Sequence, residues 1–369
     1  TGRQFAAIEE THIFSPELLN TARFGYNRSS TKTSGVSAIN PAAADPTLGI
    51  TAGQNNPQIS VSGLGTLLPG LNVEQVEDYT SNSFQEYDDV FLTKGIHSFK
   101  IGVSFEQLQL NDVQDSARHG TYSFGSLTNF LENRPRSLRA DLPGQLVRPF
   151  NYRTNIFGTY LQDDIRLRPN LTINVGLRYE FTNGINEKTG RLSAVYNPAD
   201  PTIHVQSPLF NNNTLGNFDP RIGFAWDPFR DGKTSVRGGF GIFDVLPLPS
   251  MIFTFATSNA PFFGSGTISN LSQGDFPTGA FVKLANLTNP PLQVPYVQQN
   301  PKRSYVQQWN LNLQREVLPG LTAMVAYVGS HGVHLPFRSD NSNTVIPTLT
   351  SAGYLFPDPV EIGRASCRE

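Results

Sequence analysis

The chain has 369 residues, of which 16% are charged and 11% aromatic, and its 28 Lys plus Arg nearly balance its 30 Asp plus Glu. The formal charge of −2 argues against a nucleic-acid partner, because such a protein needs a basic surface to neutralise phosphates. The aromatic content excludes a globally disordered chain, and no apolar run reaches the roughly 18 residues that a membrane-spanning helix requires.

Alternation with a period of two residues is the main signal along the chain. Successive strand side chains point to opposite faces, so residues two apart share a face. Only residues 126–132 offer one or two helical turns, and the sequence therefore predicts an all-β protein. The alternating apolar positions are, in chain order, Ala22, Phe24 and Tyr26; Phe99, Ile101, Val103 and Phe105; Leu171, Ile173, Val175, Leu177 and Tyr179; Ile222, Phe224 and Trp226; and Trp309, Leu311 and Leu313.

Short and long connections alternate between these strands. Short turns with Pro, Gly or Asn occur at 15–17, 95–97, 169–170, 228–233 and 318–320. Long polar connections occur at about 29–81, 111–151, 182–218 and 245–304. Outer-membrane barrels combine short periplasmic turns with long outer loops in this way. We therefore expect an antiparallel meander of about ten strands that forms part of a large transmembrane β-barrel.

The two faces of the expected sheet leave two interpretations open. The apolar face would meet lipid in a barrel and a second sheet in a soluble sandwich. Arginines on the polar face suit a water-filled lumen, and aromatic residues near strand ends suit the membrane interfaces, so we favour the barrel. We expect Tyr26, Tyr179 and Tyr327 towards the outer interface and Trp226 towards the periplasmic one.

Residues 160–180 (YLQDDIRLRPNLTINVGLRYE) resemble a hairpin of TonB-dependent outer-membrane transporters, above all of the Oar-like group. Further matching segments are 219–228 (DPRIGFAWDP), 234–243 (TSVRGGFGIF), 308–315 (QWNLNLQR) and 326–332 (AYVGSHG). The resemblance covers about 80–330 and implies energy-coupled uptake of a scarce solute through a plugged barrel of ~22 strands. A plug, a TonB-contacting segment and a closing strand are not recognised here, so we interpret residues 1–360 as an interior part of such a barrel.

The last nine residues, 361–369, resemble the translation of a sequencing adapter. We therefore expect them not to be native, which would remove the only cysteine, Cys367, and with it every thiol chemistry.

Three groups of residues suggest chemistry, and we set each aside. Asp163 and Asp164 are adjacent in a strand and point to opposite faces, so they cannot share a substrate. His331 and His334 have no acidic ligand nearby, which argues against a metal site. The glycines of 237–241 lie in a strand rather than before a helix, which argues against a dinucleotide-binding loop. We expect no catalytic residue, no metal and no cofactor.

Two sets of residues are candidates for contact with a solute. Aromatic residues in the outer loops could stack on a ligand, or could pack the loops together, which is the interpretation we favour. The loop candidates are Tyr122, Phe124, Phe130, Phe262 and Phe263, with Phe253 and Phe255 in the same connection; the candidates for the lumen wall are Arg23, Asn174, Arg178, Arg221, Arg237 and Asn310.

The expected function is solute uptake across the outer membrane. The expected partners are outer-membrane lipid, the TonB complex and a small-molecule or oligosaccharide ligand such as a siderophore or glycan. Two alternatives remain at this point: an adhesion or passive-pore protein of the outer membrane without TonB coupling, and a secreted soluble β-sandwich that binds glycans.

Overall fold

A computed structural model describes the protein over residues 1–34, 45–50, 56–64, 76–115, 119–143, 148–197, 200–211, 215–251, 259–288, 294–336, 348–351 and 353–355. Segment 361–369 and the aromatic candidates Phe253 and Phe255 lie outside these described residues.

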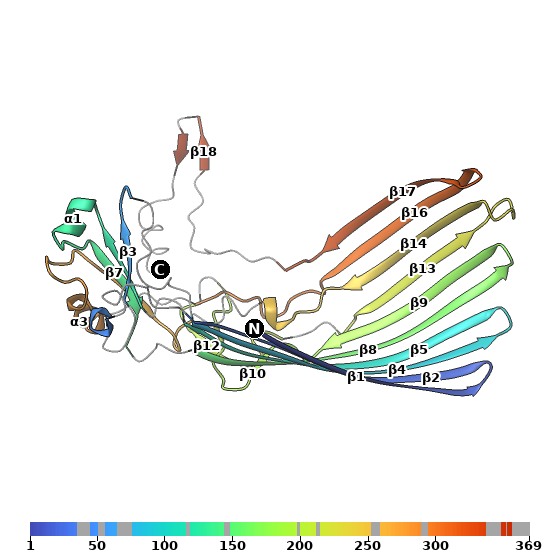
Figure 1. The fold of residues 1–369 in the computed structure, drawn as a ribbon, viewed down its shortest axis with the longest axis horizontal. Helices are drawn as coiled ribbons and strands as arrows, with labels where there is room; N and C mark the ends of the chain where they lie inside the picture. Colours follow the sequence, from blue (N-terminus) through green and yellow to red (C-terminus); the bar gives the residue numbers. More distant parts are fainter. Residues whose placement is uncertain are drawn as a thin grey trace.

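The dominant element is one antiparallel sheet that contains a meander of ten strands. Figure 1 shows these strands side by side, with the hairpin turns at one end of the sheet and the longer connections at the other. In spatial order they are β1 (Gly2–Ser15), β2 (Leu18–Ser34), β4 (Val76–Lys94), β5 (His97–Asp115), β8 (Arg148–Arg168), β9 (Leu171–Thr182), β13 (Phe218–Trp226), β14 (Thr234–Asp244), β16 (Tyr305–Leu318) and β17 (Leu321–Val333). The predicted all-β meander of about ten strands is confirmed.

The predicted short turns all join consecutive strands. Gly95 and Gly320 adopt φ angles of 63° and 79°, which L side chains rarely adopt, so glycine permits the reversal there. Trp226 is the last residue of β13, beside the 227–233 turn. Several strands are longer than the sequence indicated. Strand β2 continues to Ser34 and β5 to Asp115, although the long connections were expected to begin at about 29 and 111.

The strand register separates an apolar face from a polar face. Paired residues in adjacent strands share a face, and the pairs Val103–Thr159, Thr159–Tyr179 and Leu177–Pro220 carry the apolar face across the sheet. Its side chains are exposed: Val103 and Ile222 are each 54% accessible and Tyr327 is 64% accessible. All of the predicted alternating apolar residues lie on this face. A soluble sandwich would bury them beneath a second sheet, and no second sheet covers them in the part of the chain that the structure describes, which disagrees with that alternative.

The long connections contain a second sheet that the sequence did not indicate. Its strands are β15 (Ser265–Ser269), β7 (Ser137–Asp141), β6 (Thr121–Phe124) and β3 (Gln58–Val61), in that spatial order. They come from three different connections and are packed with helices α1 (Leu127–Leu131) and α3 (Gly279–Ala285). Helix α1 confirms the predicted helical turn, and the Ser126 hydroxyl caps its N-terminus by accepting from Asn129 N.

A further apolar core lies where β5 and β8 run into the connections. It is formed by Leu110, Phe150, Tyr152, Ile185, Leu192, Ala194, Leu209 and Phe210. The remaining short elements are β10 (Asn186–Glu187), β11 (Ser193–Ala194), β12 (His204–Val205), β18 (Thr348–Thr350), β19 (Gly353–Leu355) and two 3₁₀ turns at Pro46–Leu48 and Pro249–Met251. Because β10 pairs with β8 and Leu192 is fully buried, part of this connection is anchored to the large sheet.

Candidate functional site

The polar face of the large sheet gathers all six residues that the sequence assigned to a lumen wall. Arg23 pairs with Tyr87, Arg178 with Asp219, and Asn310 with Gly239. Following the register from strand to strand places Arg23, Asn174, Arg178, Arg221, Arg237 and Asn310 on one side of the sheet. Whether this side lines a solute path stays a prediction.

Opposite charges pair across neighbouring strands in the first half of this face. Arg23 Nη2 donates to Asp89 Oδ2 at 2.7 Å, and its Nε lies 3.4 Å from Glu9 Oε2. The Asp89 side chain is only 5% exposed and also accepts from the Tyr160 hydroxyl. Three strands, β2, β4 and β8, are therefore tied together through one carboxylate.

Arg178 and Asn174 continue the same pattern on β9. Arg178 Nε donates to Glu180 Oε2 at 2.7 Å, and Asn174 Nδ2 donates to Asp164 Oδ1 at 2.6 Å. Asp164 is thus held on the polar face, whereas Asp163 on the apolar face lies 2.6 Å from His97 Nδ1. The prediction that these two aspartates point to opposite faces is confirmed.

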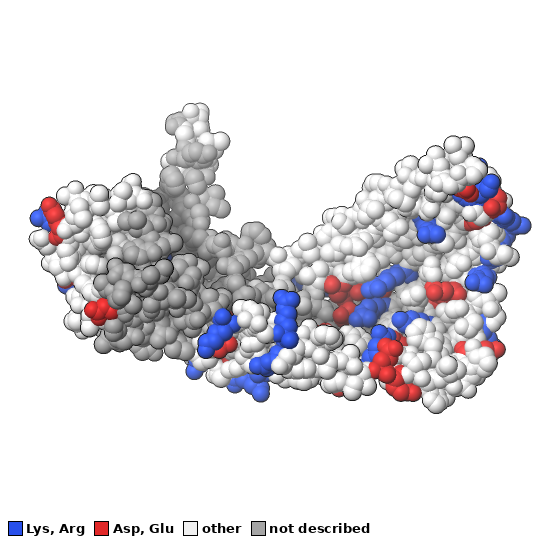
Figure 2. All heavy atoms as spheres, viewed as in Figure 1, with Lys and Arg blue, Asp and Glu red and all other residues white. Residues whose placement is uncertain are grey.

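The second half of the polar face has a different composition. Arg221 lies over the Phe243 ring at 4.5 Å from its centroid, and Arg237 Nε donates to Ser235 Oγ at 3.0 Å. Around them are small residues and amides: Gly223, Gly239, Gly241, Gln308, Asn310 and Asn312. Figure 2 shows the same contrast, with charges of both signs gathered over part of the large sheet beside broad uncharged areas.

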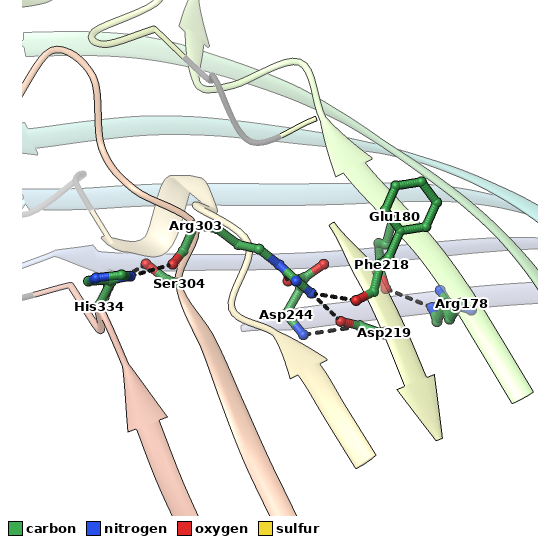
Figure 3. A network of polar contacts seen from close by, with 8 residues as sticks. All are labelled: Arg178, Glu180, Phe218, Asp219, Asp244, Arg303, Ser304 and His334. Carbon is green, nitrogen blue, oxygen red and sulfur yellow. Dashed lines mark hydrogen bonds and ion pairs between the residues drawn. The ribbon is translucent and has the colours of Figure 1, made fainter. Parts of the chain in front are cut away.

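A cluster at the loop end of β13, β14 and β16 escaped the sequence analysis. Arg303 Nη2 donates to Asp219 Oδ1 at 2.5 Å and to the carbonyl oxygen of Phe218 at 3.1 Å, while its Nε donates to Asp244 Oδ1 at 2.6 Å. The two carboxylates are 1% and 2% exposed. In Figure 3 the guanidinium of Arg303 lies between Asp219 and Asp244, close to the pair of Arg178 and Glu180.

This cluster, which we call the Arg303 clasp (Asp219, Asp244 and Arg303), fastens three strand ends. Asp244 N donates to Asp219 Oδ2 at 3.2 Å, and Ser304 Oγ donates to the carbonyl oxygen of His334 at 2.6 Å, which extends the contact to the end of β17. The only local signal in the sequence is an acidic residue at a strand end next to a long connection. That signal does not indicate which basic residue completes it.

Most of the loop aromatics belong to the core of the small sheet. Tyr122 is fully buried and Phe124 is 2% exposed, so neither ring face is open to a ligand from solvent. Phe130 packs edge-to-face on Phe124 at 5.1 Å, and Phe263 is 6% exposed, whereas Phe262 keeps part of its surface accessible. The packing interpretation therefore describes Tyr122, Phe124 and Phe130.

The Tyr122 hydroxyl shows how the small sheet holds the segment before α3. It donates to the carbonyl oxygens of Asp275 and Pro277 at 3.0 and 2.8 Å. Burial raises the pKa of the Tyr122 phenol, so the group stays protonated and remains a donor at every physiological pH.

The chain is similar to a curated transporter and to several solved structures. It is 26% identical over 212 residues to the TonB-dependent transporter Oar of Myxococcus xanthus, which covers 54% of this chain and 18% of that relative. The chain thus spans less than a fifth of the relative's length. The outer membrane transporter YddB of Escherichia coli is 12% identical, with a TM-score of 0.45, over 88% of this chain and 34% of that one.

Two further solved structures have the same kind of similarity. The copper transporter OprC is 10% identical, with a TM-score of 0.45, over 89% of this chain and 38% of that one. The Pseudomonas aeruginosa FpvA is 12% identical, with a TM-score of 0.40, over 90% of this chain and 40% of that one.

The family assignment rests on a match along almost the whole sequence. The family described as "Outer membrane beta barrel domain" matches residues 1–361. The match agrees with the exposed apolar face and with the alternation of short turns and long connections in the ten-stranded meander. The chain therefore belongs to the outer membrane beta barrel domain family and is part of a protein of the cell outer membrane.

Proposed function

We propose that the chain forms part of the wall and several outer loops of a TonB-dependent transporter, which takes up a scarce solute across the outer membrane. The solute class is a siderophore, a glycan or a similar small ligand. The energy comes from a TonB complex that acts on a plug. The chain itself contributes no catalytic step in this proposal.

The observation that carries the proposal is the division of one sheet into an exposed apolar face and a polar face of paired charges, in a chain similar to a TonB-dependent transporter. Arg23, Arg178 and Arg303 all engage carboxylates. Paired charges leave a wall polar without a strong single-sign field, which suits a surface that contacts water and a packed plug.

The connections support the same proposal at the loop end. Strands from three connections form the small sheet around a buried core. A folded body built from several outer loops is a feature that a passive pore for small solutes does not require. A path closed by folded loops and opened by energy input is what selective uptake needs.

The proposal is tested with the full-length protein that contains this chain. We expect proteoliposomes that hold it to exclude arabinose in a swelling assay, because a plugged barrel is closed at rest. We also expect the purified periplasmic domain of TonB to bind it in a pull-down. Arabinose-driven swelling at a porin-like rate, together with no binding of the TonB domain, would favour the passive-pore alternative and reject the proposal.

A further inference from the structure

Seven aromatic side chains form a belt across the apolar face of the large sheet. Their ring centroids lie 4.8–5.1 Å apart in the pairs Tyr26–Phe84, Phe105–Phe157, Phe157–Phe181 and Tyr179–Phe218. The strand register places all seven rings on the same face. Aromatic girdles of this kind mark the water interfaces of a membrane barrel. We call this feature the aromatic belt.

The level of the aromatic belt shows which interface it marks. Phe84 lies ten residues before the end of β4, Phe105 lies eight residues after the start of β5, and Phe157 lies eleven residues before the end of β8. At ~3.3 Å per residue and a tilt of ~45°, the rings are roughly 19–26 Å from the level of the short turns. The apolar band of a barrel is ~25 Å tall and its long loops are extracellular, so the belt lies at the outer interface.

Beyond the aromatic belt, the same face changes to amide and basic side chains. We call this region of β2, β4, β5 and β8 the amide band; it consists of Arg28, Asn82, Gln107, Gln109, Asn111, Arg153 and Asn155. Gln109 Nε2 donates to Gln107 Oε1 at 2.8 Å, and Gln107 Nε2 donates to Asn155 Oδ1 at 3.4 Å. The Tyr26 hydroxyl donates to Asn82 Oδ1 at 3.3 Å, so this ring of the belt turns its polar end toward the band.

The two arginines of the amide band contact neutral groups. Arg28 Nη1 donates to Asn82 Oδ1 at 3.0 Å. Arg153 Nη2 donates to Asn111 Oδ1 at 2.9 Å, and its Nη1 donates to the carbonyl oxygen of Tyr152 at 2.7 Å. Both arginine side chains therefore have a fixed position, and both retain N–H groups for a further acceptor.

The positive charge of the amide band is not neutralised by an ion pair. Among the described residues, neither Arg28 nor Arg153 is bound to a carboxylate, whereas Arg23 and Arg178 on the polar face each are. Glu187 acts on Arg153 through its charge, but it is 3% exposed and accepts from three backbone N–H groups. Two cations among neutral amides suit a ligand that carries both anionic groups and hydroxyl groups.

The height of the amide band selects the kind of ligand. Arg28 lies ten residues after the start of β2, and Arg153 lies fifteen residues before the end of β8. The same strand geometry places them roughly 23 and 35 Å from the level of the short turns, that is, from the edge of the apolar band to about 10 Å beyond it. A phospholipid headgroup layer is only ~5–8 Å thick, so it does not reach Arg153. A lipid with a larger headgroup reaches both arginines.

We propose that the amide band binds a glycolipid of the outer leaflet whose sugar headgroup carries phosphate groups. Arg28 and Arg153 are three strand spacings apart, about 14 Å, so they meet separate phosphates of one headgroup. The sugar hydroxyls meet Asn82 and Gln109, which lie between the two arginines, and the acyl chains lie against the aromatic belt.

A second copy of this chain is a poorer occupant of the amide band. A two-fold axis along the membrane normal would bring equal heights, and hence like charges, together. The inference depends on the outer-membrane location and not on solute transport, so a failure of the proposed uptake function would leave it standing.

The test uses the full-length protein that contains this chain, delipidated in detergent and titrated with diphosphorylated lipid A or with phosphatidylglycerol, and bound lipid is measured by native mass spectrometry. We expect lipid A to be retained at the lower concentration. The double variant R28Q/R153Q should need at least about tenfold more lipid A for the same occupancy, as the loss of charge-assisted hydrogen bonds predicts. The matched control K94Q/R168Q removes two exposed cations at the turn end of the same face and should leave lipid A retention unchanged.

Both double variants are first checked for folding by heat-dependent gel mobility, and the single variants R28Q and R153Q replace R28Q/R153Q if it fails to fold. Retention of phosphatidylglycerol at the same concentration as lipid A would overturn the proposal. So would an unchanged lipid A titration in the folded amide-band variants, or an equal loss of retention in K94Q/R168Q.

Discussion

Removing the guanidinium of the Arg303 clasp should destabilise the barrel far more than removing an exposed arginine. Arg303→Met leaves Asp219 and Asp244 without their cation, although both are at least 98% buried. Breaking a buried ion pair from one side costs about 3–5 kcal/mol, because a buried charge remains uncompensated. Arg303 itself is 23% exposed, so we expect the lower end, about 3 kcal/mol.

Urea titration of the protein in phospholipid vesicles, followed by heat-dependent gel mobility, measures this loss. Neutralising the carboxylates as well, in R303M/D219N/D244N, should recover about 2 kcal/mol of it, since the uncompensated charges are gone. Arg166→Met, at an exposed position near a short turn, is the matched control and should change stability by less than about 0.5 kcal/mol. Equal losses for the two single arginine variants would refute the reasoning.

Three further predictions concern single side chains. Gly102→Val should cost about 1–3 kcal/mol in the same urea titration, because the new side chain would overlap the Tyr160 ring. Tyr122→Phe should speed amide hydrogen exchange in α3 and β15 several-fold, because the donor to the Asp275 carbonyl is lost at a net cost of about 1 kcal/mol. Burial alone would raise the pKa of the Asp275 carboxylate, but its hydrogen bond with Lys283 lowers that pKa overall. The ionised carboxylate therefore stabilises the small sheet fully at neutral pH, and we expect this stabilisation to be lost as the pH drops below about 4.

Each of these predictions has a control in the same chain. Gly176→Val introduces the same side chain where the nearest atoms are 3.5 Å from the new Cβ, so it should be much milder than Gly102→Val. Hydrogen exchange in the β8–β9 hairpin should not respond to Tyr122→Phe. Asp275→Asn should abolish the acid-dependent increase in exchange after correction for the intrinsic pH effect; an unchanged increase would assign it to other groups.

The large sheet was predictable because its signal is local. Within residues 171–179, apolar and polar side chains alternate, so nine positions are enough to assign an apolar and a polar face. The short turn at 169–170 shows that the preceding strand is the one that pairs with them. The six polar-face candidates followed from the same alternation. A strand residue's face depends only on its parity, and the register confirms that all six share one face.

The small sheet and the Arg303 clasp were not predictable because their contacts are distant in the sequence. Gln58 of β3 pairs with Thr121 of β6, and Asp141 of β7 pairs with Ser265 of β15. Strands of four or five residues are too short to show a clear period, and the choice of partner depends on the assembled fold. Arg303 likewise lies 84 residues from Asp219, with no spacing rule to connect them.

The small sheet also constrains how the outer loops can move. Strand β6 hydrogen bonds with β3 from the first long connection, and β7 hydrogen bonds with β15 from the fourth. Withdrawing any one of these strands would leave backbone groups unpaired and would expose Tyr122 and Leu138, which are fully buried. Displacement as a unit keeps those bonds and that core intact. Any opening of the polar face at this end that preserves the small sheet must therefore move the three connections together, with the strain falling where they leave the ten-stranded sheet.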